Sequence, residues 1–588
     1  MVGNLLKEKY SEITKMLNID NQASAEKINL IIKKSLENFT RSCQNPAIWC
    51  YGKHTKMLMV DYIYEMKNVK YIIDNNVVAE SQSGFCIIRQ DEIKERKIDG
   101  IIISSFKFRQ EIKEILKREF PDIRYLDIYE EMEHEGIQLS FEYFSQTHPY
   151  CHYMKINELQ RKLQKAMDKS ERRDILLELI RECVNMKDFQ FALVWVGELR
   201  QFGDSAFTEQ LQTKIGELYQ AELQAAEGIS ENNVLMVCVD GLRRRDFMES
   251  KMPQLYEWSK EKAFLFENAF SMSTSTYESL IPTFSENDDL RTRYYDSATI
   301  SEKECRFFRE AVKQGRTVRF YTDGMQFIDS KYVVVSAKSL TAAEKLWEFV
   351  NDAAEEKNGL YYIHFLYESH FSYPNSYTTD KVVADGTSIF FDFMEIAGGK
   401  LKTDYVKQQK DALHYMDDLL YPFFKRLKCR MVIFADHGNV LFDKDFKLSD
   451  VERTQLSFAD ELIEIPLIVK SPEYGCGENH QLESLKSLND IVIQLLQGVK
   501  RELAPKKYIK VLRSHIYNPD FQYLYKKCNH EQELMAFELF IFEDGSRIAV
   551  YEDGSYEVIS NKQEIAYYLK IIQDEITVCS QVKQESFH

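Results

Sequence analysis

Two short stretches of the sequence bring acidic and imidazole side chains to the ends of very apolar segments. The first, VLMVCV, runs directly into Asp240, and the second, MVIFA, runs into Asp436 and His437. Each apolar run has the length of a buried β-strand and is much too short to span a membrane. Because open α/β sheets bind ligands at the carboxyl ends of their strands, both stretches are candidates for a metal or phosphate site.

A run of hydroxyl side chains, SMSTST at residues 271–276, precedes an apolar segment of helical character. Two carboxylates and one imidazole suit a borderline divalent cation such as zinc or manganese. A threonine hydroxyl that completes such a set is activated, because a bound cation lowers the pKa of a coordinated oxygen. A helix amino terminus beside it favours a phosphate or sulfate group. Singly, an Asp-His-Gly triplet is most often a turn and a Ser/Thr run a helix cap, but the three elements in this order favour an active site.

These elements belong to a chain that is too long for one hydrophobic core. Its 588 residues predict two to four domains, and 44% hydrophobic content indicates globular packing. The alternation of strand-like and helix-like segments divides the chain into a helical segment at 1–44, a Rossmann-like α/β domain at 45–150, a helical connector at 151–227, an α/β domain at 228–500 that carries the residues above, and an α+β extension at 501–588.

The region 45–150 predicts a second, smaller sheet. Its apolar runs AIWCY, VKYIID, FCII, DGIIISS and IRYLDIY alternate with helical stretches, as is typical of a parallel α/β sheet. Gly52 precedes Asp74 by about 20 residues, the separation of glycine loop and ribose-binding acid in a dinucleotide fold. The phosphate-binding loop needs three glycines where this chain has one, and Lys53 and Thr55 crowd it. We therefore expect no tight dinucleotide binding.

The remaining regions carry clear periodicity but no chemistry. Apolar positions at helical spacing in DILLELIRECV and FALVWVGEL predict a helical hairpin or spacer within 151–227. The stretch FELFIFEDGSRIAVYEDGSYEVI has two Asp-Gly turns between apolar strands, Asp544-Gly545 and Asp553-Gly554, and predicts a small antiparallel meander.

Charge and cysteine usage restrict the partners and the compartment. A net charge of −17 argues against a broad nucleic-acid-binding surface. The eleven cysteines are scattered without a CxxC pair, which indicates free thiols in a reducing compartment. The initial MVGNLLKEKYSEITKML is an amphipathic helix without an apolar signal core, and no window approaches the roughly 18 to 20 apolar residues of a bilayer span. We expect a cytoplasmic protein without a transmembrane segment, and the oligomeric state stays open.

Over roughly residues 230–500, the ordered motifs resemble the sulfatase-like branch of the alkaline phosphatase superfamily. The matching segments are VLMVCVDGLRRRDF, MPQLYEWSKEKAFLFENAFS, STSTYESLIPTFS, YYIHFLYESHFSYP, YVKQQKDALHYMDDLLYPFFKRL, MVIFADHG and FADELIEIPLIV. Within that branch, the sequence is most similar to phosphoethanolamine transferases and lipoteichoic acid synthases. The resemblance implies an α/β sandwich with a mixed central sheet and a metal-dependent phospho-group enzyme.

The resemblance also implies the nucleophile. In these transferases a threonine attacks, followed by a serine and a proline before a Phe-Ser pair. Matching on that tail selects Thr276 and places three residues in register: Ser279, Phe284 and Ser285. The nearest competitor is Thr274, and Ser275 comes next.

Further roles follow from the same resemblance. One divalent metal ion, zinc or manganese, would be held by four residues: Asp240, Thr276, Asp436 and His437. His370 occupies the place of a family histidine that contacts the transferred phosphate or protonates the leaving group; without the family it reads as an ordinary loop histidine. Among the arginines 243–245, Arg243 is the candidate to approach a substrate anion. Three consecutive side chains cannot all face one site, so the others are expected in solvent or in ion pairs.

Three positions depart from the family pattern. Asp240 stands where the transferases usually have glutamate, which leaves metal binding intact. Gln455 stands where a second basic substrate-binding residue is expected, which weakens the positive charge at the phosphate site. Leu366 replaces the aspartate of an Asp-x-x-x-His motif. We therefore expect one metal ion rather than two.

The expected function is transfer of a phospho group, of the phosphoethanolamine or phosphoglycerol type, through a phospho-threonine intermediate. The substrate would be a phosphate-containing small molecule or a glycan or lipid precursor. A phosphodiesterase or phosphatase that uses water stays open. A sulfatase needs Cys/Ser-x-Pro-x-Arg, and TYESL at 276–280 has neither the proline nor the arginine. A non-catalytic scaffold is disfavoured by the complete residue set. The segment 377–399 is expected to set specificity, and it reads equally well as a mobile surface loop.

Overall fold

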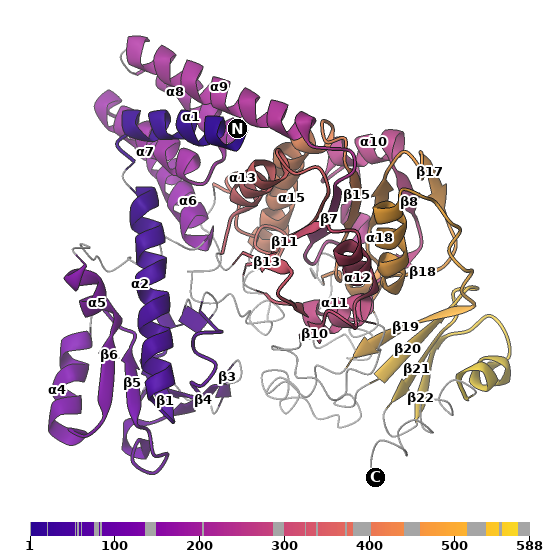
Figure 1. Ribbon diagram of the computed structural model, residues 1–588, viewed down its shortest axis with the longest axis horizontal. Coiled ribbons are helices and arrows are strands. Elements are labelled where there is room, and N and C mark those ends of the chain that lie inside the picture. Colours follow the sequence, from indigo (N-terminus) through magenta and orange to yellow (C-terminus); the bar gives the residue numbers. More distant parts are fainter. Residues whose placement is uncertain are drawn as a thin grey trace.

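The computed structural model has an α/β fold with one large mixed sheet and one smaller, mostly parallel sheet (Figure 1), which confirms the predicted fold class. It describes residues 2–19, 21–52, 54–55, 58–59, 62–75, 81–82, 85–106, 108–135, 149–202, 205–285, 299–323, 325–336, 339–370, 373–379, 402–439, 459–513, 537–551 and 555–573. Lys53, Gln455, the Asp553-Gly554 turn and most of the segment 377–399 lie outside these residues.

The smaller sheet has six strands in the order β3-β4-β2-β1-β5-β6. Its neighbours pair in parallel except β3 and β4, which are antiparallel. The predicted parallel sheet, separate from the large one, is therefore confirmed. Its strands and helices are β1 (Pro46–Trp49), β2 (Tyr71–Ile73), β3 (Ser81–Gln82), β4 (Phe85–Ile88), β5 (Gly100–Ile103), α4 (Arg109–Glu119), β6 (Arg124–Asp127) and α5 (Ile128–His134).

The two N-terminal helices pack in different places. Helix α1 (Val2–Met16) buries Leu6, Tyr10 and Ile13 in the large hydrophobic core. Helix α2 (Asn21–Ser42) buries its apolar stripe against the small sheet instead. The periodicity of residues 1–44 correctly predicts helices, but it does not show that they serve two separate cores.

The predicted helices between the sheets are α6 (Pro149–Lys165), α7 (Lys169–Asn185), α8 (Phe189–Leu199) and α9 (Ser205–Gly228). Consecutive members pack on one another, and α1 packs on α9. Asp168 and Asp188 cap α7 and α8, because their carboxylates accept hydrogen bonds from backbone N–H groups of the first turn.

The large sheet has eight strands in the order β13-β11-β14-β7-β15-β16-β8-β17. The strands from β13 to β15 run parallel, and β16 is antiparallel to both of its neighbours, β15 and β8. The strands are β7 (Val234–Val239), β8 (Phe264–Phe266), β11 (Thr317–Tyr321), β13 (Val333–Val335), β14 (Gly359–Phe365), β15 (Arg430–Phe434), β16 (Leu467–Lys470) and β17 (Gly477–Asn479).

Helices cover the large sheet on both faces (Figure 1), which explains why every residue of β7 is buried. Two further pairs of short strands lie beside it. These helices and strands are α10 (Pro253–Lys262), β9 (Ala269–Phe270), α11 (Thr276–Phe284), β10 (Ile300–Ser301), α12 (Arg306–Lys313), β12 (Ile328–Asp329), α13 (Ala342–Ala353), α15 (Lys402–Phe424), α17 (Asp460–Ile463), β18 (Glu483–Ser484) and α18 (Leu488–Gln497).

The C-terminal part forms the predicted antiparallel meander with one additional strand. Its sheet runs β19-β20-β21-β22, with bounds Tyr508–Arg513, Phe537–Phe542, Arg547–Tyr551 and Tyr556–Ser560. Gly545 adopts a φ of 82° in the turn between β20 and β21, a conformation that glycine reaches without steric cost. Among the described residues, no helix is both long and apolar enough to cross a membrane.

A buried ion pair joins two strand ends of the large sheet. Lys345 on α13 contacts the carboxylate of Asp323, which follows β11, and donates to the backbone carbonyl of His364 on β14 at 2.7 Å. The side chains of Lys345 and Asp323 are 0% and 1% exposed. Each charge is therefore tolerated in the core because the other compensates it.

We expect Lys345→Met to destabilise the protein by about 3 to 5 kcal/mol, because Asp323 would remain buried and uncompensated. Calorimetry should show the melting temperature of the large-sheet unit falling by roughly 10 °C. The matched control is Lys260→Met, which removes a surface lysine paired with Glu257 and should leave the transition nearly unchanged. Equal melting temperatures for Lys345→Met and the control would contradict this account.

The structure of the small sheet leads to a prediction about nucleotide binding. Asp74, the residue spaced like a ribose-binding acid, accepts a hydrogen bond from the Tyr51 backbone N–H at 2.9 Å. His54 occupies the same end of the sheet, and its Nδ1 lies 2.5 Å from the Tyr129 hydroxyl. We expect no submicromolar affinity for a nicotinamide or sugar nucleotide. Submicromolar binding in calorimetry that is lost when Asp74 is changed to alanine would overturn this expectation.

Candidate active site

The register of the large sheet brings Asp240 and Asp436 together. Strand β15 pairs in parallel with β7, with Phe434 opposite Cys238. Each aspartate stands two residues beyond this pair, so both carboxylates leave the sheet side by side at its carboxyl edge. The backbone N–H of Gly241 donates to Asp436 Oδ1 at 3.1 Å and links the two strand ends. Both aspartates are fully buried.

His364 enters the site from β14, the other neighbour of β7. It stands opposite Cys238 in the parallel register, and its Nε2 lies 3.0 Å from Asp240 Oδ2. Its Nδ1 lies 3.0 Å from the Tyr362 hydroxyl. We did not select His364 from the sequence. The signal that could have found it is a histidine inside the otherwise apolar strand GLYYIHF, whose residues are all buried.

Thr276 is the first residue of α11, and its hydroxyl faces the carboxylates. Thr276 Oγ1 donates to Asp240 Oδ2 at 3.2 Å and lies 3.4 Å from His437 Nε2. The competing hydroxyl of Ser275 instead donates to Glu278 at 3.5 Å. For Thr274, the described contacts include none to Asp240 or His437. The geometry therefore brings Thr276, rather than its neighbours, to the predicted ligand set.

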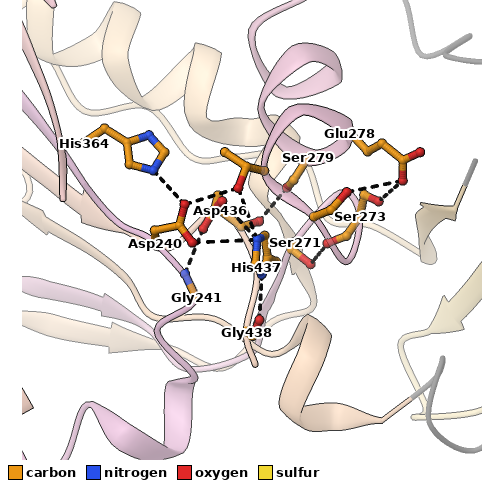
Figure 2. A network of polar contacts seen from close by, with 12 residues as sticks. Asp240, Gly241, Ser271, Ser273, Glu278, Ser279, His364, Asp436, His437 and Gly438 are labelled. Atoms are coloured by element: carbon orange, nitrogen blue, oxygen red, sulfur yellow. Dashed lines mark hydrogen bonds and ion pairs between the residues drawn. The ribbon is translucent and has the colours of Figure 1, made fainter. Parts of the chain in front are cut away.

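Further hydrogen bonds fix the loop that carries Thr276 (Figure 2). Ser273 donates to Glu278 at 2.9 Å, and Ser271 donates to the Ser273 carbonyl at 2.7 Å. Ser279, one turn into α11, donates to the Asp436 backbone carbonyl at 2.5 Å. The hydroxyl-rich sequence therefore bonds the loop internally and ties α11 to the end of β15.

His437 is oriented by its own backbone. Its Nδ1 lies 2.6 Å from the Gly438 carbonyl, so Nδ1–H is the donor and Nε2 faces the carboxylates. His437 Nε2 lies 3.3 Å from Asp436 Oδ2 and 3.9 Å from Asp240 Oδ1. Gly438 allows the turn because a Cβ there would lie 1.9 Å from the Glu461 carbonyl oxygen.

The two buried carboxylates affect each other's ionisation. Burial and the neighbouring charge of Asp240 raise the pKa of Asp436 above its ordinary value. Burial also opposes ionisation of Asp240, but the His364 hydrogen bond and the charges of His370 and His437 hold the pKa of Asp240 below its ordinary value. Burial disfavours the charged form of His437, yet the two aspartates outweigh it and raise the pKa of that imidazole. The site therefore concentrates negative charge that a cation would neutralise.

The donor set fits a divalent cation. Asp240, His364 and Asp436 each offer a ligand atom, and these atoms lie within 4.8 Å of one another. No hydrogen bond from the described residues reaches Asp240 Oδ1 or Asp436 Oδ2, although both atoms are buried. Buried carboxylate oxygens without a donor are costly in a protein interior unless a cation binds them. The predicted residues Asp240, Thr276, Asp436 and His437 converge here, and His364 joins them.

His370 lies close to this group but outside it. Its charge acts on Asp240, and its backbone carbonyl accepts a hydrogen bond from Tyr373 N–H at 2.6 Å. The neighbouring Ser369 carbonyl lies 3.7 Å from the position of a Cβ on Gly241. The loop that carries His370 therefore passes directly over the turn after β7.

The expected substrate contact of Arg243 does not fit its position. Arg243 donates from Nε and Nη2 to the two carboxylate oxygens of Asp246, at 2.6 and 2.9 Å. The pair is 1% and 2% exposed, so a buried carboxylate already neutralises the guanidinium. Arg243 is therefore not part of the proposed substrate site. Arg244 and Arg245 pair with Glu464 and Glu461, as expected for the other arginines.

Similarity to known proteins is found among solved structures only. No protein-family model matches the chain, and the comparison with curated proteins gives no match. Among solved structures, the chain is similar to a 2-O GAG sulfatase (13% identity, TM-score 0.42, 60% of this chain and 92% of that one). It is also similar to a phosphonate monoester hydrolase of Agrobacterium radiobacter (11% identity, TM-score 0.40, 59% and 95%). A third is the C-terminal periplasmic domain of a phosphoethanolamine transferase from Campylobacter jejuni (14% identity, TM-score 0.32, 47% and 96%).

Identities and TM-scores at this level leave the reaction to be argued from the site itself.

The geometry of the site predicts that metal binding depends on the carboxylates of Asp240 and Asp436. We expect Asp240→Asn and Asp436→Asn to lower the affinity for zinc or manganese by more than the roughly 10- to 100-fold that loss of an outer hydrogen-bond partner costs. Calorimetry on chelator-treated protein measures this. Affinity should also fall as the pH is lowered, because ligand imidazoles and carboxylates must be deprotonated to bind.

The matched control is His480→Ala, which removes an exposed histidine at the end of β17 and should leave the affinity unchanged. Wild-type affinity in both aspartate variants would show that the cation binds elsewhere.

Proposed function

We propose that the protein is a metal-dependent phospho-group transferase that acts through phosphorylated Thr276. The observation that carries the proposal is the contact of Thr276 Oγ1 with Asp240 and His437 at the first residue of α11. A threonine that served only as the first residue of a helix would need no contact with two strand ends of the large sheet. The family resemblance supports the same assignment.

The residues of the site have separate roles in the first half-reaction, the transfer of the phospho group to Thr276. Asp240 accepts the hydrogen bond of the Thr276 hydroxyl and thereby orients the lone pairs of the attacking oxygen. A divalent cation held by Asp240 and Asp436, with His364 or His437 as the imidazole ligand, would act as a Lewis acid that favours the ionised hydroxyl. The Thr276 hydroxyl proton passes to Asp240 Oδ2, its hydrogen-bond acceptor, as Oγ1 forms a bond to phosphorus and the bond to the leaving oxygen breaks, which gives a phospho-threonine.

Two further groups would stabilise charge during this step. The first turn of a helix directs backbone N–H groups outward, so the start of α11 favours the equatorial phosphoryl oxygens. His370 would donate a proton to the leaving oxygen or hold a phosphoryl oxygen. His364 keeps Asp240 in place through the contact at 3.0 Å.

An acceptor alcohol completes a transfer, whereas water completes a hydrolysis. We propose transfer, on the resemblance to phosphoethanolamine and phosphoglycerol transferases, to a phosphate-containing small molecule or a glycan or lipid precursor. We include a reducing, cytoplasmic location in the proposal. Cys43, Cys50, Cys86, Cys183, Cys238, Cys305, Cys429 and Cys476, all within the described residues, are free thiols. A nucleic-acid substrate is disfavoured by the net charge of −17.

The central experiment removes the nucleophile. Thr276→Ala should lower turnover of bis(4-nitrophenyl) phosphate by roughly three orders of magnitude or more, because the variant cannot form the covalent intermediate. Thr276→Ser keeps a hydroxyl and should retain part of the activity. Mass spectrometry of wild-type protein quenched during turnover should find the phospho group on the peptide that contains Thr276.

Thr274→Ala is the matched control, because it removes a neighbouring hydroxyl of the same loop and should cost much less. If Thr276 served only as the first residue of α11, Thr276→Ala would change the stability slightly and leave the turnover of the folded protein unchanged. Wild-type turnover in both variants would mean that the active site lies elsewhere. Products formed with and without added alcohols distinguish the transferase from the hydrolase.

A further inference from the structure

One face of helix α6 carries polar side chains that are buried. Tyr153, Asn157 and Gln160 follow a spacing of four and three residues, so they lie on the same side of the helix. They are 0%, 0% and 4% exposed. A helix that served only as a spacer would present apolar residues at such positions.

All three side chains donate to one segment of the large-sheet unit. We call residues 366–370 and 373–379 the His370 segment. The Tyr153 hydroxyl donates to Glu368 Oε1 at 2.5 Å. Asn157 Nδ2 and Gln160 Nε2 donate to the backbone carbonyls of Asn375 and Ser376, at 3.0 and 2.6 Å.

The other side of the His370 segment contacts the candidate site. Asn439, two residues beyond His437, donates from Nδ2 to the Tyr373 hydroxyl at 2.5 Å. The segment therefore lies between α6 and the turn that follows β15. His370 stands within it, and the carbonyl of the preceding Ser369 lies 3.7 Å from the position of a Cβ on Gly241, the residue after Asp240.

The backbone of this segment is held in an unfavourable conformation. Tyr373 has a φ of 56° although it carries a bulky side chain, and it is 1% exposed. Such a conformation persists where the surroundings impose it. Glu368 is likewise fixed from two sides, because its Oε1 also accepts the Ala342 backbone N–H at 2.8 Å.

The two amide side chains on α6, Asn157 and Gln160, stabilise the protein core less than apolar side chains would. Each uses its nitrogen, while Asn157 Oδ1 and Gln160 Oε1 are buried and accept no hydrogen bond from the described residues. Burying an amide with one end unsatisfied is unfavourable compared with an apolar residue of similar size. Their presence is explained if the function requires the backbone carbonyls of Asn375 and Ser376 to be held in fixed positions.

We propose that Tyr153, Asn157 and Gln160 are positioning residues that place His370 for the reaction, so that the helical connector completes the active site. The proposal rests on the proposed function and adds that α6, outside the large sheet, sets the efficiency of the same site. These side chains act through the His370 segment and do not touch the substrate.

The test uses near-isosteric variants of the full-length chain: Tyr153→Phe, Asn157→Leu and Gln160→Met. The matched control is the double variant Glu158→Gln/Lys162→Gln, which alters an exposed pair on the same helix. Hydrogen exchange is followed without substrate at three amides that donate within the segment, those of Tyr373, Tyr377 and Thr378. Turnover of the aryl phosphodiester and the affinity for zinc are measured beside it.

Loss of one buried hydrogen bond should speed exchange at these amides by roughly tenfold, while the control and the zinc affinity stay at wild-type values. Asn157→Leu should lower kcat roughly tenfold with a much smaller change in KM. His370→Ala alone should cost roughly 100-fold or more. In that background Asn157→Leu should cost less than about twofold, because residues that act through one group are non-additive.

Unchanged exchange in all three variants would overturn the proposal, and so would a tenfold loss that persists in the His370→Ala background. Exchange and zinc affinity are read without turnover. A failure of the proposed function, seen as full activity of Thr276→Ala, is therefore distinguishable from a failure of this inference.

Discussion

Two carboxylates forced together in the protein interior are the constraint on which the rest of the site depends. The parallel pairing of β14, β7 and β15 fixes Asp240 and Asp436 at one edge of the sheet, where water cannot separate their charges. The surrounding groups respond to that charge: His364 contacts one carboxylate, Gly241 N–H binds the other, and His437 faces both. A cation at this position would relieve the repulsion and activate the adjacent threonine in one step.

The proposed nucleophile, Thr276, depends on the same two strand ends, because helix α11 presents it to them. Before α11, Ser271 and Ser273 bond to the loop and to Glu278, and Ser279 ties the first turn of the helix to the end of β15. The hydroxyl is thus presented by a helix that is itself tied to the sheet. Preorganisation of this kind is what makes a weak nucleophile effective, because little rearrangement is left for the reaction.

Much of this architecture could be predicted from the sequence. Long apolar runs predict β7 and β15, helical periodicity predicts α7 and α8, and the Asp544-Gly545 turn predicts the meander. His364 was missed because a histidine within an apolar strand carries no local mark of function, and its role appears once β14 is aligned beside β7. The pairing of Arg243 with Asp246 could not be separated from a substrate contact, because both require an arginine near a strand end. The bonds from α6 to the His370 segment join residues more than 200 positions apart, which no local pattern encodes.

The division of the two N-terminal helices has a consequence for how the chain is made. Tyr10 on α1 packs against Phe189 and Trp347, whereas α2, which follows directly, belongs to the core of the small sheet. Along the sequence, the small-sheet unit therefore comes after α1 and before the residues that α1 packs against. During synthesis this unit can close on itself early, while α1 must wait for several hundred further residues before its apolar face is covered. Helix α1 is therefore synthesised well before the residues that cover its apolar stripe, so it reaches its packed position late.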